Sequence, residues 1–144
     1  MNRALAIALV VVTVLALVAG FATVGGPFQA RMEKIDRERA GDLSAIVNAL
    51  ACDDPQGPLP TELITDAIRT VCPGMFLVPR NLTDPETGED YAYRVTDEKT
   101  FEVCAEFYDP AMISDENLGY YPRSAEGIAF ENNRGCIKGK LSER

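Results

Sequence analysis

The sequence has no histidine among its 144 residues, and basic residues are few. The lack of histidine excludes histidine-dependent triads, acid–base mechanisms and metal sites, because this side chain is the usual base and the commonest metal ligand. The chain carries 14 Lys and Arg against 22 Asp and Glu, for a formal net charge of −8. Proteins bind nucleic acid through Lys and Arg that neutralise phosphate, so we expect no nucleic-acid partner.

One long stretch, residues 4–24, has no charged side chain. As a helix it would be about 30 Å long, which is enough to cross the hydrocarbon core of a bilayer. We therefore predict a transmembrane helix from Leu5 to Val24, within an anchor at residues 1–26, and the lipid bilayer as its partner.

A cleaved signal peptide is the alternative for this stretch. Gly20 and Ala22 offer small residues at a plausible cleavage site. The run is longer than the roughly 7–15 apolar residues of a signal-peptide core, which favours the retained anchor.

The basic residues around the anchor disagree about its orientation. Arg3 precedes the apolar run and favours a cytoplasmic N-terminus. A larger group follows the run closely: Arg31, Lys34, Arg37 and Arg39. Because the positive-inside rule counts Lys and Arg and largely ignores acids, these four favour the opposite orientation.

The four cysteines decide the orientation. They are even in number and widely spaced, at Cys52, Cys72, Cys104 and Cys136. No Cys-x-x-Cys occurs, so neither a thioredoxin-like motif nor a zinc ribbon is expected. Two disulfides would stabilise a small exported domain, which places the C-terminal part in an oxidising compartment. The alternative is a cytosol-facing membrane subunit with four reduced thiols.

Four cysteines allow three pairings, and we favour Cys52–Cys72 with Cys104–Cys136. Cys52 ends a predicted long helix and Cys72 ends a short one, so an antiparallel pair of helices would bring them together. Cys104 faces away from the apolar side chains of its predicted strand. A bond to Cys136 would hold the C-terminal segment across that side.

After the anchor we predict an α+β fold, with an amphipathic helix and a short helix packed on a small antiparallel sheet. The amphipathic helix runs from Pro27 to about Ala51. Its residues 27–41 form a solvated, mixed-charge stalk, and the exported domain takes up residues 42–144. One stripe at helical spacing follows this helix: Phe28, Met32, Ile35, Arg39, Leu43, Ile46 and Leu50. The short helix, at residues 60–71, would bury Leu63, Ile64, Ala67, Ile68 and Val71.

Alternation of apolar residues predicts a hairpin and one further strand. Tyr91, Tyr93 and Val95 alternate on the first strand, and residues 96–99 form the loop. The returning strand alternates at Phe101, Val103, Ala105 and Phe107. Residues 109–133 are irregular, and residues 135–137 form a last short strand.

Three acids around a glycine turn are candidate calcium ligands: Asp84, Glu86 and Asp90. Calcium prefers several oxygen ligands, but the spacing of an EF-hand loop is missing. The alternative is an Asp-Pro turn whose side chain binds its own backbone. Tyr120-Tyr121-Pro122 is either an exposed contact patch or ordinary loop packing.

Three segments follow one another in a set order. They are Asp42-Leu43-Ser44-Ala45-Ile46 with Ala49-Leu50, then Gly57-Pro58-Leu59-Pro60-Thr61-Glu62-Leu63, then Asp84-Pro85-Glu86-Thr87-Gly88 with Tyr91 and Tyr93. In this order residues 42–107 resemble pseudopilins of type II secretion, of the protein G type. The resemblance implies an apolar N-terminal helix, an amphipathic helix, a short helix, an Asp-Pro-x-x-Gly turn and an antiparallel hairpin.

The chain looks more like a group of membrane-anchored bacterial proteins with the same turn and a cysteine in the hairpin than like a working pseudopilin. In a pseudopilin the Gly-Phe cleavage site precedes the apolar run, whereas Gly20-Phe21 follows most of it here. Cleavage at that position would remove the anchor.

These observations together predict a noncatalytic, single-pass protein of the bacterial inner membrane. Its periplasmic domain would contact or scaffold another envelope protein, and no catalytic residue or cofactor is expected beyond the candidate calcium ligands. The alternative of a different class is an exported hydrolase that uses acidic residues. With 22 acids, however, pairs of carboxylates arise by chance.

Overall fold

The computed structural model describes residues 2–24, 26–52, 54–74, 81–113 and 127–141. Two compact units make up the chain, Met1–Met32 and Glu33–Arg144. The predicted contact patch at Tyr120-Tyr121-Pro122 lies outside the described residues.

The first unit contains helix α1, Arg3–Val24, which agrees with the predicted span. Its window Arg3–Gly20 has a mean hydropathy of 2.5, and it is the one described helix long and apolar enough to cross a membrane. The hydroxyl of Thr13 donates to the carbonyl of Leu9 at 2.8 Å. This bond satisfies a polar group of the apolar stretch inside the helix itself, as a bilayer requires.

Helix α2, Pro27–Leu50, begins at a proline, whose missing N–H costs nothing in the first turn. From Ile35 onward its buried residues follow the predicted stripe, and they are Ile35, Asp36, Arg39, Ala40, Leu43, Ser44, Ile46, Val47, Ala49 and Leu50. The prediction of a solvated stalk up to residue 41 is therefore wrong in its last two turns. Asp36 is 0% and Arg39 5% exposed, because polar partners from distant loops cover them: backbone N–H groups at Asp36 and a carboxylate at Arg39.

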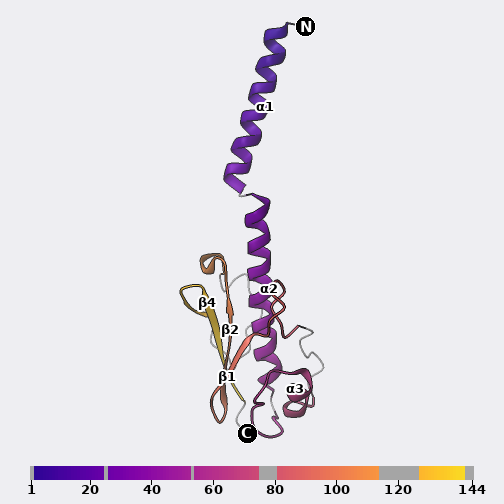
Figure 1. Cartoon of the computed structure of the whole chain (residues 1–144), viewed down its shortest axis with the longest axis vertical. Coiled ribbons are helices and arrows are strands. Elements are labelled where there is room, and N and C mark those ends of the chain that lie inside the picture. The colour runs from indigo at the N-terminus through magenta and orange to yellow at the C-terminus, as the bar shows by residue number, and fades with distance from the viewer. Residues whose placement is uncertain (1, 25, 53, 75–80, 114–126, 142–144) are drawn as a thin grey trace. The chain divides into compact units, whose positions relative to one another are not determined.

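The second unit holds a four-stranded antiparallel sheet in the order β1-β2-β4-β3. Figure 1 labels β1, β2 and β4. The strands are β1 Ala92–Asp97, β2 Thr100–Glu106, β3 Ala129–Glu131 and β4 Arg134–Lys140. Side chains alternate between the two faces of a strand. Phe101, Val103 and Ile137 share a core with the apolar stripe of α2, so one face of the sheet is the inner face.

Two glycines of β4 make room for aromatic rings on the inner face. Gly139 is the register partner of Phe101, and a Cβ at Gly139 would overlap the Phe101 ring. At Gly135 a Cβ would lie 2.6 Å from Phe130 and 2.7 Å from Phe107, two rings that meet edge to face. Glycine lets the rings cross the strand and fill the core.

The short helix and the strands differ from prediction at their ends. Helix α3 covers only Thr65–Val71 and buries Ile68 and Val71, whereas Ile64 is 51% exposed. A register shift between Val95 and Asp97 lengthens β1, so the β1–β2 turn is shorter than the predicted loop.

Strand β3 was not predicted, because it has only three residues and lies within the stretch expected to be irregular. A signal for it does exist in the sequence: Asn132-Asn133 connects β3 to β4, and Asn132 has a positive φ of 55°. Asparagine is favoured in such two-residue hairpin turns.

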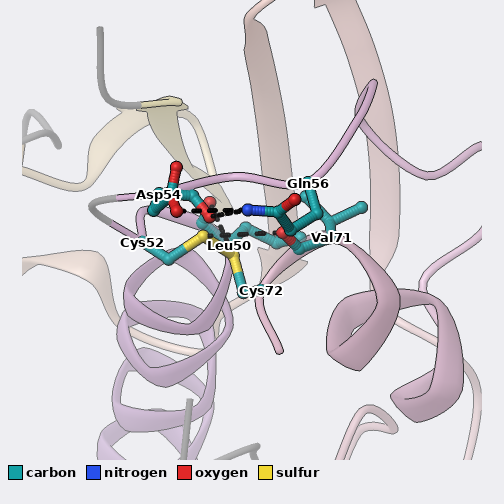
Figure 2. Close-up of a disulfide and its surroundings, with 6 residues drawn as sticks. All are labelled: Leu50, Cys52, Asp54, Gln56, Val71 and Cys72. Carbon is teal, nitrogen blue, oxygen red and sulfur yellow. Dashed lines mark hydrogen bonds between the residues drawn. A yellow bond between two sulfur atoms is a disulfide. The ribbon is translucent and has the colours of Figure 1, made fainter. Parts of the chain in front are cut away.

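Both predicted disulfides are confirmed. Cys52–Cys72 joins the chain just after α2 to the chain just after α3, with a Cα–Cα distance of 5.9 Å (Figure 2). Cys104–Cys136 links directly opposed residues of β2 and β4, 4.1 Å apart at Cα. The second bond therefore fastens β4 beside β2, rather than holding a segment across the outer face.

Candidate functional site

A cluster of charged side chains surrounds Arg39, and we call it the Arg39 cluster: Asp36, Arg39, Asp84, Glu86 and Tyr108. The guanidinium donates through Nε and one terminal nitrogen to the two carboxylate oxygens of Asp84. The same terminal nitrogen lies 3.2 Å from Glu86 Oε2, and the other lies 3.4 Å from Asp36 Oδ1. One arginine of α2 thus holds the Asp84–Gly88 turn against the helix.

The ring of Tyr108 closes the cluster. Its centroid lies 5.2 Å from the guanidinium carbon of Arg39, within cation–π range. Its hydroxyl donates to Glu86 Oε2 at 2.6 Å.

Asp36 binds the backbone that follows β2. Its carboxylate accepts the N–H of Tyr108 at 3.0 and 3.1 Å and the N–H of Asp109 at 2.9 Å. These two backbone N–H groups lie beyond the hydrogen bonds that pair β2 with its neighbours, and Asp36 satisfies them instead. Asp36 and Arg39, one helical turn apart, therefore attach two separate loops to α2.

The turn that meets Arg39 is organised by Asp84. Its Oδ1 accepts the backbone N–H groups of Glu86 and Thr87, each at 2.9 Å. Gly88 has a φ of 71°, a conformation that favours glycine, and its N–H donates to the Asp84 carbonyl at 2.9 Å. This is the Asp-Pro turn that the sequence offered as the alternative to a calcium site.

These contacts set the protonation of the cluster. Burial alone would raise the pKa of Asp84, but hydrogen bonds from Arg39, Thr87 and Glu86 outweigh burial and lower the pKa to about 2. Burial likewise acts to lower the pKa of Arg39, and the neighbouring carboxylates, Asp84 first, raise it instead. The pair is therefore ionised throughout the physiological range.

A second contact ties α2 to Tyr91, the residue before β1. The Tyr91 hydroxyl donates to Asp42 Oδ2 at 2.8 Å. Burial raises the pKa of Asp42, although this hydrogen bond opposes the rise. Burial and the nearby Asp42 carboxylate also raise the pKa of Tyr91. Burial raises the pKa of Tyr93 to about 12, and its hydroxyl donates to the Pro60 carbonyl at 3.0 Å.

The three candidate calcium ligands have different surroundings. Asp84 and Glu86 share Arg39, and Asp90 is exposed, with its backbone bridged to Thr83. A calcium ion at Asp84 and Glu86 would have to displace the guanidinium, because the same oxygens bind it. Asp84, with its low pKa, is also a poor general acid for hydrolysis.

The outer face of the sheet carries the second feature of note. The strand register places four small or sulfur-bearing residues in one row across it: Ala92, Cys104, Cys136 and Ala129. Charged residues border this row, with Arg94, Glu102 and Lys138 on one side and Glu106, Arg134 and Glu131 on the other. A hollow of about 490 Å³ lies over this face.

One potential metal-binding group lies in this hollow. The ligand atoms of Glu102, Cys104 and Cys136 lie within 4.8 Å of one another. The two sulfurs are bonded to each other, so the oxidised protein offers no thiolate for a metal.

Asp36, Arg39 and Tyr108 were not recognised as a site in the sequence. A signal for Arg39 was present, because it occupies a position of the stripe that the structure buries. Its partners Asp84 and Glu86 follow 45 and 47 residues later, and no sequence pattern connects them to the helix.

The comparisons with other proteins give no family: no family model matches the chain, and neither a curated protein nor a solved structure is found to be similar to it.

Proposed function

We propose that the protein is a noncatalytic, single-pass protein of the bacterial inner membrane whose periplasmic domain contacts another envelope protein. The observation that carries this proposal is the use of all four cysteines in two disulfides, in a chain that also contains a membrane-length apolar helix.

The disulfides support the exported side for the second unit. Cytosolic thiols are kept reduced, whereas the bacterial periplasm is oxidising. Both bonds lie within Glu33–Arg144, and α1 lies in the other unit. This arrangement suits a cytoplasmic N-terminus, α1 in the bilayer and the disulfide-bonded domain outside the cytoplasm.

A contact function is supported by the way the charged side chains are used. Arg39 and Asp36 hold two loops on α2, and Asp42 binds Tyr91, the residue before β1. Loops fixed in this manner present a surface that needs little ordering when a partner binds, which favours affinity. A small domain with fixed loops therefore suits recognition of another protein.

The order of elements supports a pseudopilin-like fold. An apolar helix, an amphipathic helix, a short helix, the Asp84–Gly88 turn and an antiparallel sheet follow one another as the resemblance implies. Gly20-Phe21 lies near the end of α1, so cleavage there would separate the domain from its helix. A permanently anchored relative therefore fits better than a subunit processed for assembly.

Topology is tested with fusions placed after Arg144. An alkaline phosphatase fusion should be active, and a fluorescent protein that folds only in the cytoplasm should stay dark. In parallel, thiols are alkylated in unreduced, denatured protein taken directly from the envelope, and all four cysteines should resist. The reverse fusion pattern, or free thiols in fresh protein, contradicts the proposal.

Contact with an envelope protein is tested by photo-crosslinking from the exposed outer face. A photoreactive residue at Lys138 should give one discrete crosslinked species in intact cells. The matched control is Thr13, which lies within α1. Equal crosslinking patterns at the two positions, or none at Lys138, would contradict a specific contact.

A further inference from the structure

The two disulfides have different surroundings. Cys72 is 1% exposed and belongs to the hydrophobic core. Figure 2 shows its bond to Cys52 beside Leu50 and Val71, and the two sulfurs lie 3.7 and 3.8 Å from the carbonyl oxygens of these residues. Cys72 is closed to an incoming thiol, and Cys52, which is partly buried, packs against the same core.

Cys104–Cys136 lies on the opposite side of the sheet from the core. Both cysteines line the hollow of about 490 Å³ on the outer face. Cys104 is 3% exposed, and Cys136 is only partly buried. A small thiol can therefore reach Cys136 through the hollow without any change in the fold.

The sheet does not need this bond to keep its strands together. Strands β2 and β4 pair along their whole length, from Thr100 opposite Lys140 to Glu106 opposite Arg134. The inner faces of both strands also contribute to the core, through Phe101 and Ile137. Opening the disulfide therefore leaves the backbone ladder and the core contacts in place.

Charged groups of both signs border the bonded sulfurs, and the Glu102 carboxylate lies within 4.8 Å of each sulfur. Cys136 lies between Arg134 and Lys138 on the outer face, because side chains two residues apart share a face. Cys104 lies between Glu102 and Glu106. Arg134 and Lys138 offset these carboxylates for an incoming thiolate and favour a thiolate on Cys136.

From accessibility, strand pairing and charge together, we propose that Cys104–Cys136 is a thiol–disulfide exchange site. It reacts with a dithiol while the fold and the Cys52–Cys72 bond stay intact. The inference goes beyond a contact function and does not depend on which protein the domain contacts.

The exchange has two steps. A thiolate of the dithiol attacks Cys136 Sγ, a new S–S bond forms, and the electron pair of the Cys104–Cys136 bond leaves on Cys104, which takes a proton from water. The second thiolate of the dithiol then attacks its own sulfur in the mixed disulfide. Cys136 leaves as a thiolate stabilised by Arg134 and Lys138. The dithiol is oxidised to a disulfide, and the protein is reduced to two thiols.

The test is graded reduction of the full chain in detergent. Protein is incubated with dithiothreitol under native conditions, quenched with an alkylating agent and mapped by mass spectrometry, with circular dichroism followed in parallel. Cys104 and Cys136 should be alkylated at least about tenfold faster than Cys52 and Cys72, because Cys72 lies in the core, Cys52 packs against it, and their bond waits for local opening. A smaller ratio, or alkylation only together with loss of the dichroism signal, overturns the proposal.

The charge argument has its own matched pair of variants. Lys138→Gln should slow the exchange about threefold. This is the effect expected in water when one unit charge about 7 Å from the reacting sulfur is removed. Lys99→Gln removes an exposed lysine from the β1–β2 turn and should leave the rate unchanged. The difference should disappear in 1 M salt, where such interactions are screened. Equal rates for the two variants at low salt overturn the role given to Lys138.

The order of attack is tested with a monothiol, which stops at the mixed disulfide. Brief treatment with glutathione should place the adduct on Cys136. An adduct mainly on Cys104 overturns the proposed first step.

Discussion

Among replacements of a single charged residue, Arg39→Met should lower the free energy of unfolding of the second unit the most. Methionine keeps an apolar stem of similar length and removes the guanidinium. The side chains left without their cation are 1% exposed at Asp36, 12% at Asp84 and 28% at Glu86. These carboxylates are too buried for water to replace the hydrogen bonds that Arg39 donated to them.

The expected loss follows from burial. Removing one partner of a buried ion pair costs about 3–5 kcal/mol, because the other charge stays behind unpaired. Glu86 can regain some hydration, which favours the lower end of this range. A domain of this size has about 5–15 kcal/mol of stability, so a loss of about 3 kcal/mol is a large fraction of the total.

Arg94 provides the matched control. Its guanidinium lies 2.6 Å from Glu102; the Arg94 side chain is 71% exposed and the Glu102 side chain 13%. A pair with an exposed partner contributes about 0–1 kcal/mol, because water and salt screen it, and its loss leaves one carboxylate without a cation rather than three. Arg94→Met should therefore cost less than about 1 kcal/mol.

The assay is urea unfolding of the full chain in detergent, followed by far-UV circular dichroism. With an m value of about 1.5 kcal/mol/M, a loss of 3 kcal/mol lowers the midpoint by about 2 M. Adding Asp84→Asn to Arg39→Met should restore part of the loss, because one unpaired charge is then removed. Equal midpoints for Arg39→Met and Arg94→Met, or a double variant whose losses simply add, would refute the reasoning.

Three further outcomes are expected. The pKa of Asp84 is about 2 in the folded protein, against about 3.9 in an unfolded chain. The ionised carboxylate therefore contributes about 2 kcal/mol to the free energy of unfolding above about pH 5, and this contribution is lost as the pH falls towards 2. Urea titrations from pH 6 to 2 should show this loss, and Asp84→Asn should show a flatter profile. Gly139→Ala should lower the urea midpoint by the equivalent of about 1–3 kcal/mol, because the new methyl group overlaps Phe101. Gly41→Ala, an exposed position in α2 with no atom within 4 Å of the added Cβ, should be neutral or stabilising, and a loss there would contradict the steric argument. The anchored protein should stay in the membrane pellet after alkaline carbonate washing with Met1 retained, and a mature chain that starts after the apolar run would show cleavage instead.

Local patterns in the sequence were sufficient for the helices, the central hairpin and the disulfides. An uninterrupted apolar run predicted α1, and a proline followed by a helical stripe predicted α2. Alternation around Phe101 and Val103 separated the inner face of β2 from the outer one, and this placed Cys104 on the outer side. The helices and the hairpin depend on residues close together in the chain, so periodicity alone could find them. The disulfides join residues 20 and 32 positions apart, and their pairing followed from where the predicted elements end and face.

Only the tertiary structure decided which charges are buried. Asp36 and Arg39 read as part of a solvated stalk, because a helix with alternating charges is usually exposed. They are buried because the Asp84–Gly88 turn and the backbone after β2 reach back to α2 across 45 and 72 residues. The same is true of the row Ala92–Cys104–Cys136–Ala129, which exists only in the register of four paired strands. Burial and register are properties of contacts between distant segments, and a single sequence contains no local signal for them.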